Sequence, residues 1–337
     1  MSLLVIIGIV GAAGYLTWQG FSKTSNEPQV PVKIQVEKGM TAAQIADVLE
    51  QNKVIKSAFI FRYEVKKKGV GANFQPGTYN MKTGMDYNAA IKALTAGPPI
   101  KYIDLTIPEG WTSKQITERV SSQTKIDAAS YLSLVTDGRV AVEYPFLQNN
   151  GAPTKNLEGY LYPQTYKVPD DITAEKFLNM QLAQFQKETE SLDWEQTQSL
   201  GRTPYEILVI ASLIERETRV NDEKPLVASV IYNRLAKNML LQIDATVQYA
   251  LPEWKDKLTY DDLKVESPYN TYLHQGLPPG PICNPSASSI EAALTPGQTQ
   301  YLYYVLAPDN SGRHTFAATY DEFLHAKAQY QASQNGR

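Results

Sequence analysis

One segment, residues 203–218, constrains the fold more than any other because it predicts a helix with almost no polar face. Thr203 and Glu206 match a capping box and Pro204 takes the first helical position, so a helix is expected to begin here. Apolar residues at positions 207–211, 213 and 214 then surround the axis on nearly every side. Such a helix is stable only in the middle of a domain. Other elements must therefore pack around it from several directions.

Two glutamates stand at the carboxyl end of this predicted helix. At about 100° per residue, Glu215 and Glu217 each continue a buried face. Burial disfavours a carboxylate anion, and the negative end of the helix dipole acts in the same direction. A carboxyl in this position can keep its proton near neutral pH and act as a general acid. The alternative is that the helix ends here and both carboxylates reach water, or that one pairs with Arg216 or Arg219.

The sequence carries none of the common cofactor signatures. It contains no P-loop, no dinucleotide-binding glycine fingerprint and no serine nucleophile elbow. His274, His314 and His325 are far apart in the chain, so no metal site is indicated, and the single Cys283 is interpreted as a structural thiol. The net charge is only -3 without a dense basic tract, which argues against nucleic acid as a partner. We therefore expect carboxylate chemistry without a cofactor or metal.

The amino terminus is apolar and predicts a membrane anchor. No charged side chain occurs in residues 1–22, and residues 3–16 are almost entirely apolar. An uncharged helix over residues 1–22 is long enough to cross a bilayer. Trp18 and Phe21 suit the membrane interface. We expect an uncleaved, single-pass anchor at residues 1–22, followed by a polar linker at residues 23–30. A cleaved signal peptide is the alternative.

A pattern of strand, glycine turn and threonine-capped helix occurs twice, 71 residues apart. The corresponding pairs are Ile34 and Leu105, Val36 and Ile107, Gly39 and Gly110, Thr41 and Thr112, Gln44 and Gln115, and Ile45 and Ile116. A looser third copy has Asp86 in the cap position. We expect residues 31–100 to form a small α/β module. It could bind glycan, as LysM domains do, or position the next domain.

Residues 101–337 predict a larger unit in which helices and short strands mix without a regular βαβ rhythm. This mixture favours an α+β fold over a doubly wound sheet. The predicted helices are residues 113–121, 174–190, 203–218, 223–237, 286–294 and 320–334, and the predicted hairpin pairs residues 301–306 with 314–317.

Several short motifs follow one another in this unit, and each alone resembles an ordinary turn or strand edge. They are Leu-Glu-Gly-Tyr-Leu-Tyr-Pro-Gln-Thr-Tyr (157–166), Ala-Ser-Leu-Ile-Glu-Arg-Glu-Thr (211–218), Val-Ile-Tyr-Asn-Arg-Leu (230–235), Leu-Gln-Ile-Asp-Ala-Thr (241–246), Ser-Pro-Tyr-Asn-Thr-Tyr (267–272), Gly-Leu-Pro-Pro-Gly-Pro-Ile (276–282) and Arg-His-Thr-Phe (313–316). In this order they resemble the YceG/MltG family of endolytic murein transglycosylases. One departure is Gln164, where many members have an acidic residue.

The resemblance covers almost the whole chain and implies a location and an activity. It implies a single-pass protein of the cell inner membrane with its catalytic domain in the periplasm, working beside peptidoglycan synthases. It implies a lyase that cuts the MurNAc–GlcNAc β-1,4 bond within nascent peptidoglycan strands and leaves 1,6-anhydro-MurNAc ends. The family's essential glutamate is the second in Glu-x-Glu-Thr, which is Glu217 here.

A mechanism with one carboxyl follows from this assignment. Glu217 would protonate the departing glycosidic oxygen and then accept the proton of the C6 hydroxyl as that oxygen closes onto C1. The attack is intramolecular, so it requires neither a bound water nor a metal. Gln242, Tyr269, Asn270 and Tyr272 are candidates for positioning the substrate. Glu215 is expected to be structural and paired with an arginine, and no cationic pocket is expected.

Two other functions remain open at this point. A muramidase that hydrolyses the same bond would need a second carboxylate, for which Glu158, Asp244 and Glu266 are candidates. A non-catalytic scaffold would instead bind glycan through the LysM-like module.

Overall fold

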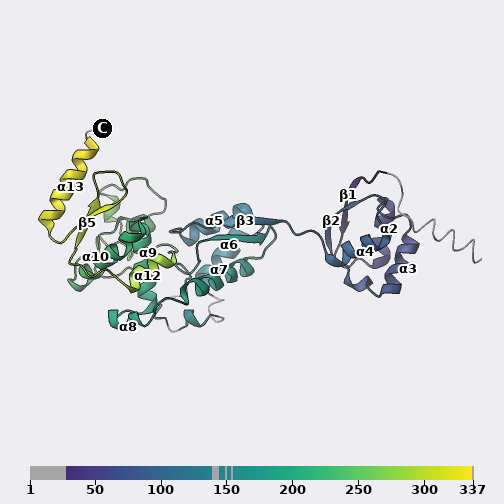
Figure 1. The fold of residues 1–337 in the computed structure, drawn as a ribbon, viewed down its shortest axis with the longest axis horizontal. Coiled ribbons are helices and arrows are strands. Elements are labelled where there is room, and N and C mark those ends of the chain that lie inside the picture. Colours follow the sequence, from purple (N-terminus) through teal and green to yellow (C-terminus); the bar gives the residue numbers. More distant parts are fainter. Residues whose placement is uncertain (1–27, 139–143, 149, 153–154, 336–337) are drawn as a thin grey trace, which may run out of the picture. The chain divides into compact units, whose positions relative to one another are not determined.

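The computed structural model of the protein describes residues 28–138, 144–148, 150–152 and 155–335. It divides into two compact units, of which the first ends at Lys101 and the second begins at Tyr102 (Figure 1). The predicted anchor at residues 1–22 and most of the predicted linker at 23–30 lie outside the described residues. None of the described helices has the length and apolar character that crossing a bilayer requires.

The first unit is a small α/β module built on one pair of strands. Strand β1 (Pro31–Val36) runs antiparallel to β2 (Gly77–Lys82), with Ile34 opposite Tyr79 in the register. Both side chains are buried in a core to which the helices contribute. These helices are α2 (Ala42–Gln51), α3 (Ala58–Lys68), the 3-10 turn η1 (Gly71–Asn73) and α4 (Tyr87–Ala96). The likeness of this unit to LysM domains stays a prediction.

The predicted helix caps of the repeated pattern are confirmed. The Thr41 and Thr112 hydroxyls accept the backbone N–H of Gln44 and Gln115, and each glutamine side chain in turn accepts the backbone N–H of its threonine. This reciprocal arrangement satisfies two donors that a helix start otherwise leaves unpaired. Asp86 caps α4 through the N–H groups of the second and third residues after it.

The second unit is a mixed α+β fold with two small antiparallel sheets in its described part, and this fold class is confirmed. Strand β3 (Tyr102–Thr106) pairs with β4 (Thr165–Pro169), and β5 (Tyr303–Leu306) pairs with β6 (His314–Ala317). The helices are α5 (Ser113–Gln123), α6 (Ala128–Asp137), α7 (Ala174–Thr189), α8 (Gln196–Leu200), α9 (Pro204–Glu217), α10 (Lys224–Ala236), α11 (Asp244–Ala250), α12 (Ala287–Leu294) and α13 (Tyr320–Asn335), with 3-10 turns η3 (Pro145–Leu147), η4 (Asn221–Glu223) and η5 (Asp262–Lys264).

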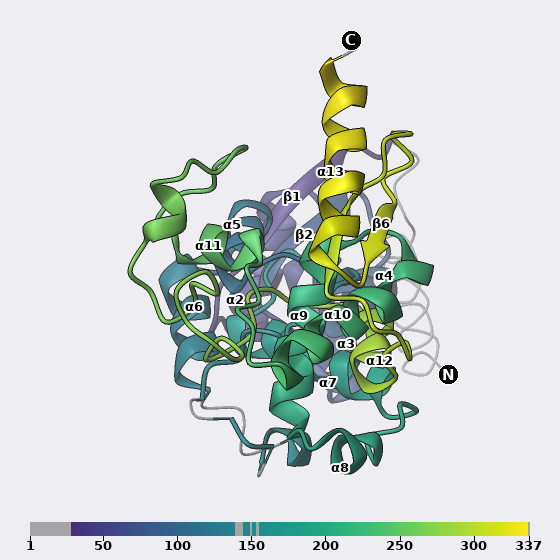
Figure 2. The same ribbon diagram turned by 90° about the vertical axis from the view of Figure 1, so that its left-hand side faces the viewer.

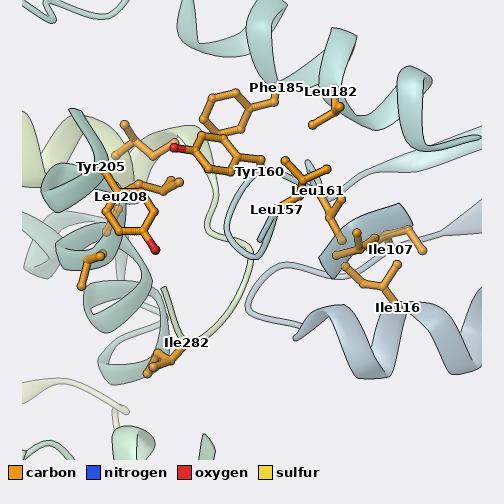
Figure 3. Close-up of a cluster of buried hydrophobic side chains, with 14 of the residues drawn as sticks. Ile107, Ile116, Leu157, Tyr160, Leu161, Leu182, Phe185, Tyr205, Leu208 and Ile282 are labelled. Atoms are coloured by element: carbon orange, nitrogen blue, oxygen red, sulfur yellow. The ribbon is translucent and has the colours of Figure 1, made fainter. Parts of the chain in front are cut away.

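Helix α9 is the central element of this unit, as the sequence predicts. Its capping box is present, and every residue from position 207 to position 214 is buried. Helices α10, α11 and α12 contact it, and α10 and α12 lie beside it in Figure 2. The same core contains an aromatic layer in which the rings of Tyr160 and Phe185 have centroids 5.1 Å apart, close to Leu208 of α9 (Figure 3).

The Leu-Glu-Gly-Tyr motif forms a tight turn against α9. Gly159 has a φ of +94°, and a Cβ there would lie 2.8 Å from Pro281 and 2.9 Å from Leu208. Only glycine is compatible with both the angle and the space. The Asn284 side-chain oxygen accepts the N–H groups of Gly159 and Leu161, each at 2.8 Å. The turn at Gly159, helix α9 and the segment 281–284, which are distant in the chain, are therefore fixed together.

Several elements were not predicted from the sequence. Residues 244–250 form helix α11, where the pattern resembles a turn or a strand edge. Strand β4, which lies opposite β3, was also missed, as were helices α6 and α8. Helices α8 and α11 have only 5 and 7 residues, too few to display a helical period.

Candidate active site

The carboxyl end of α9 opens onto a cavity of about 620 Å³, which Glu217 lines. Residues from α10, α11, the β5–β6 hairpin and α13 form the other walls, together with residues 241–243 and Tyr272 from loops. Glu217 is the last residue of the helix and is partly exposed on the cavity side. The sequence-based expectation that this side chain faces a sheltered space is met by this geometry.

Glu217 is held by a tyrosine from the hairpin. The Tyr304 hydroxyl donates a hydrogen bond of 2.7 Å to Oε2 of Glu217. Burial raises the pKa of the Glu217 carboxyl, and the nearby Asp244 carboxylate acts in the same direction. The Tyr304 hydrogen bond and electrostatic interactions with His314 and Arg216 partly oppose this rise. The net result is a carboxyl that keeps its proton to higher pH than an exposed glutamate does.

Glu215, two residues earlier, has the opposite electrostatic state. Although burial acts to raise its pKa, hydrogen bonds from Ser286 and Ser289 together with the charge of Lys224 outweigh it, so the pKa is lowered. The Ser286 and Ser289 hydroxyls both lie 2.6 Å from Oε2, and Lys224 Nζ lies 3.4 Å from it. The expected pairing with an arginine is therefore wrong, because the lysine at the start of α10 lies closer to this buried face.

The neighbouring Arg216 is occupied elsewhere. Its guanidinium donates to the backbone oxygen of Gly110 at 3.1 Å and lies 4.8 Å from the ring centroid of Trp254. The surroundings of the two glutamates therefore act in opposite directions. They favour the ionised form of Glu215, which has hydrogen-bond and charge partners, and the protonated form of Glu217. Such a separation is how protein environments assign different roles to like groups.

Two of the four predicted positioning residues line the same cavity as Glu217. Gln242 has a φ of +53°, uncommon for a residue with a side chain, and its backbone N–H donates to Thr271. The Tyr272 hydroxyl donates at 2.5 Å to Oδ1 of Asp244, the first residue of α11. Gln242, Tyr272 and Asp244 are therefore brought together with Glu217 around one space.

The other two predicted residues do not line this cavity. Asn270 is fully buried, and its amide nitrogen donates to the backbone oxygens of Leu263 and Val265. Its side-chain oxygen accepts the backbone N–H of Tyr272, so it shapes the loop that presents that tyrosine. Tyr269 packs against Tyr249 with ring centroids 4.8 Å apart. Direct contact of Tyr269 or Asn270 with substrate stays a prediction.

Sequence reasoning missed Tyr304 and Arg234 as cavity residues. Tyr304 lies 87 residues from its partner Glu217, and no motif marks it. Arg234 belongs to the Val-Ile-Tyr-Asn-Arg-Leu motif. The motif contributed to the family resemblance, but it did not indicate that this arginine lines a cavity. A cationic pocket was not expected, yet the Arg234 guanidinium lines the cavity. It donates to the backbone oxygens of Leu240, Leu241 and Leu302, which absorb most of its hydrogen-bonding capacity.

The candidate second carboxylates fall in different places. Asp244 lines the Glu217 cavity, whereas Glu158 and Glu266 do not. Glu158 lies in a separate cavity of about 550 Å³, where it accepts hydrogen bonds from Ser113, Asn284 and Tyr249. Burial raises the pKa of Glu158 to about 7. Within the residues that the structure describes, no three His, Cys, Asp or Glu side chains are grouped so as to hold a metal ion.

The arrangement suits one kind of chemistry. A carboxyl with a raised pKa, at the end of a buried helix and facing a polar cavity that also holds a second carboxylate, has the features that general-acid catalysis requires, as in enzymes that cleave glycosidic bonds.

Comparison with known proteins places the chain in one family. The sequence profile of the YceG-like family matches residues 34–329, so the chain belongs to the YceG-like family. An endolytic murein transglycosylase from Bacillus subtilis (strain 168) is 37% identical over 336 residues, which cover 97% of this chain and 92% of that protein. An endolytic murein transglycosylase from Streptococcus pneumoniae (strain ATCC BAA-255 / R6) is 30% identical over 90% of this chain and 60% of its own length.

A solved structure has the same fold. A crystal structure of a YceG-like protein from Listeria monocytogenes is 35% identical and superposes with a TM-score of 0.59. The match covers 88% of this chain and 99% of the Listeria chain.

Proposed function

We propose that this chain is an endolytic murein transglycosylase that cuts the MurNAc–GlcNAc β-1,4 bond of peptidoglycan strands and leaves 1,6-anhydro-MurNAc ends. The observation that carries the proposal is the Glu217 carboxyl, whose pKa is raised by burial at the wall of a cavity of about 620 Å³. The names of the Bacillus and Streptococcus relatives support the substrate class.

The reaction needs a proton at the leaving oxygen and a nucleophile at C1. Glu217 gives its proton to the glycosidic oxygen, and the bond from that oxygen to C1 breaks with its electron pair on the oxygen. The C6 hydroxyl of the same sugar attacks C1, and its proton passes to the carboxylate that Glu217 has become. The nucleophile is already part of the substrate, so the step benefits from proximity. Tyr304 keeps the carboxyl oriented through its 2.7 Å hydrogen bond.

Asp244 has a place in this mechanism and in its hydrolytic rival. Its carboxylate lines the Glu217 cavity and accepts a hydrogen bond from Tyr272. In the lyase it stabilises the positive charge that develops on the sugar ring. In a muramidase the same carboxylate would activate a water molecule for attack on C1. Because one residue fits both reactions, the products must decide between them.

Product analysis tests the proposal directly. Purified uncrosslinked glycan strands are digested with the full chain, and the new ends are identified by mass spectrometry. We expect anhydro-muramic ends, which are lighter by one water than the reducing ends that hydrolysis creates. Glu217→Gln should reduce the cutting rate by a factor of roughly 10² to 10⁴, whereas the matched exposed substitution Glu195→Gln should leave it unchanged. Reducing ends without anhydro-muramic acid would establish the hydrolase, and full activity of Glu217→Gln would refute the catalytic assignment.

A further inference from the structure

A buried histidine–carboxylate pair lies beside the Glu217 cavity and has no role in the mechanism above. His314 Nδ1 lies 2.9 Å from Glu223 Oε2, and the two side chains are only 8% and 3% exposed. The other carboxylate oxygen, Oε1, accepts the backbone N–H of His314 at 2.9 Å. The Thr218 hydroxyl, directly after the catalytic helix, donates to Oε2 at 3.4 Å. Three donors thus hold this carboxylate in one orientation.

A second layer shields the pair from solvent. The Arg313 guanidinium lies 3.5 Å from Glu223 Oε1 and forms a 2.6 Å ion pair with the exposed Asp222. Asp222 and Glu223 follow α9 in the turn η4, whereas Arg313 and His314 stand at the start of β6, 91 residues away. The pair therefore joins the hairpin to the carboxyl end of the catalytic helix.

The carboxylate sets the proton arrangement of the imidazole. A carboxylate can only accept, so Nδ1 carries the hydrogen and Nε2 of the neutral ring is left as an acceptor. Nε2 makes no hydrogen bond to any residue in the described ranges, and His314 lines the Glu217 cavity.

Tyr304 places the two proton-carrying groups close together. Its hydroxyl donates to Glu217, and its ring packs edge to face on the His314 ring with centroids 5.3 Å apart. Glu217 and His314 consequently both contact Tyr304 and line one cavity. The first has a proton to give, and the second has a lone pair to receive one.

We propose that Nε2 of His314 is the base that accepts the proton of the C6 hydroxyl. The inference rests on the proposed function and divides the two roles that it gives to Glu217. Glu217 protonates the glycosidic oxygen, and the bond from C1 to that oxygen breaks. The C6 oxygen forms its bond to C1 while its proton passes to Nε2. The imidazolium then returns this proton, through solvent, to the Glu217 carboxylate, and both groups are restored.

Chemical rescue is the first test. His314→Ala should reduce kcat by a factor of roughly 10² or more, with a smaller change in KM. Added imidazole should raise the rate of this variant by a factor of at least about ten. Imidazole should not rescue Glu217→Gln, because the missing group there is an acid. The matched control is His325→Ala on the exposed face of α13, which should change neither rate nor imidazole response.

The second test does not depend on the folding of a His314 variant. Glu217→Gln is expected to bind strands without cutting them. In this variant His314 should react with diethyl pyrocarbonate when free and be protected by purified glycan strands. The exposed His274 and His325 serve as internal controls that glycan leaves reactive.

The outcomes separate this inference from the proposed function. If Glu217→Gln keeps full activity, the proposed function itself fails. If Glu217→Gln is inactive and His314→Ala is fully active, only the role of His314 fails. Loss of activity without rescue by imidazole also overturns the inference, whether or not glycan protects the ring, because His314 then does not carry the proton.

Discussion

A Glu158→Gln substitution should stabilise the second unit at neutral and alkaline pH, with little effect near pH 4. Glu158 is 3% exposed, and burial raises the pKa of its carboxyl from 4.5 to about 7. For a group whose pKa is raised on folding, stability is lost as the pH rises from the unfolded pKa to the folded one. Glutamine does not ionise, so the variant escapes this loss.

The hydrogen bonds around Glu158 are compatible with the amide. Oε1 faces two donors, the Ser113 backbone N–H at 2.9 Å and the Asn284 amide at 2.8 Å, and a glutamine oxygen still accepts both. Oε2 faces the hydroxyls of Ser113 and Tyr249, which can accept hydrogen bonds from an amide nitrogen. The Ser113 backbone N–H also donates to Oε2, at 3.1 Å, but it keeps the Oε1 oxygen as an acceptor in the variant. The substitution therefore removes the titration without leaving several buried groups unpaired.

The expected magnitude follows from the two pKa values. A rise from 4.5 to about 7 corresponds to roughly 3 kcal/mol at ~1.36 kcal/mol per pKa unit. The difference in unfolding free energy between variant and wild type should therefore grow by roughly 2–3 kcal/mol between pH 5 and pH 8 and stay level at higher pH. Contributions of all other titrating groups cancel in this difference.

Urea unfolding at a series of pH values, followed by tryptophan fluorescence, measures this difference. Trp111, Trp194 and Trp254 all belong to the second unit, so their emission reports the unit that contains Glu158. Glu195→Gln, an exposed change in the same unit, should give a difference that does not vary with pH. If hydrogen bonds to the anion outweigh its desolvation, Glu158→Gln will instead lose stability relative to wild type as pH rises, and the reasoning is refuted.

Three further substitutions probe the site and its support. Tyr304→Phe removes a hydrogen bond that lowers the pKa of Glu217, so the alkaline limb of kcat against pH should move to higher pH; an unmoved limb would contradict the role of that bond. Lys224→Met leaves the buried Glu215 without its cation and should cost about 3–5 kcal/mol in urea unfolding, part of which Glu215→Gln should recover. Gly159→Ala should lower the unfolding free energy by more than 1 kcal/mol through its positive φ and two close contacts, and an unaffected midpoint would argue against the tight turn.

The parts of the fold that were predictable from sequence are those with strong local signals. Helix α9 has a capping box, a proline at its first position and an apolar run, and all three agree. Strand β4 was missed because its role depends on pairing with β3, whose nearest partner residues are 59 positions apart in the chain. Local patterns cannot report such pairings.

In the candidate site, too, the features set by local sequence were predictable and those set by tertiary contacts were not. The position of Glu215 and Glu217 on buried faces was predictable because residues within two turns set those faces, whereas the choice of Glu217 as the acid came from the family resemblance. The tyrosine partner of Glu217 and the lysine beside Glu215 are tertiary neighbours, and nothing in the local sequence marks them. An arginine partner was expected for Glu215 because arginines are the cationic residues nearest to it in the sequence. In the folded chain, the buried Lys224 lies beside Glu215 instead.

The hairpin that supplies Tyr304 has a consequence for how the protein is made. During synthesis from the amino terminus, α9 leaves the ribosome well before β5 and β6. Until the hairpin docks, Glu217 has neither its hydrogen-bond donor nor that wall of its cavity. A chain that has been synthesised only as far as α9 therefore cannot hold Glu217 in the arrangement that the folded protein shows.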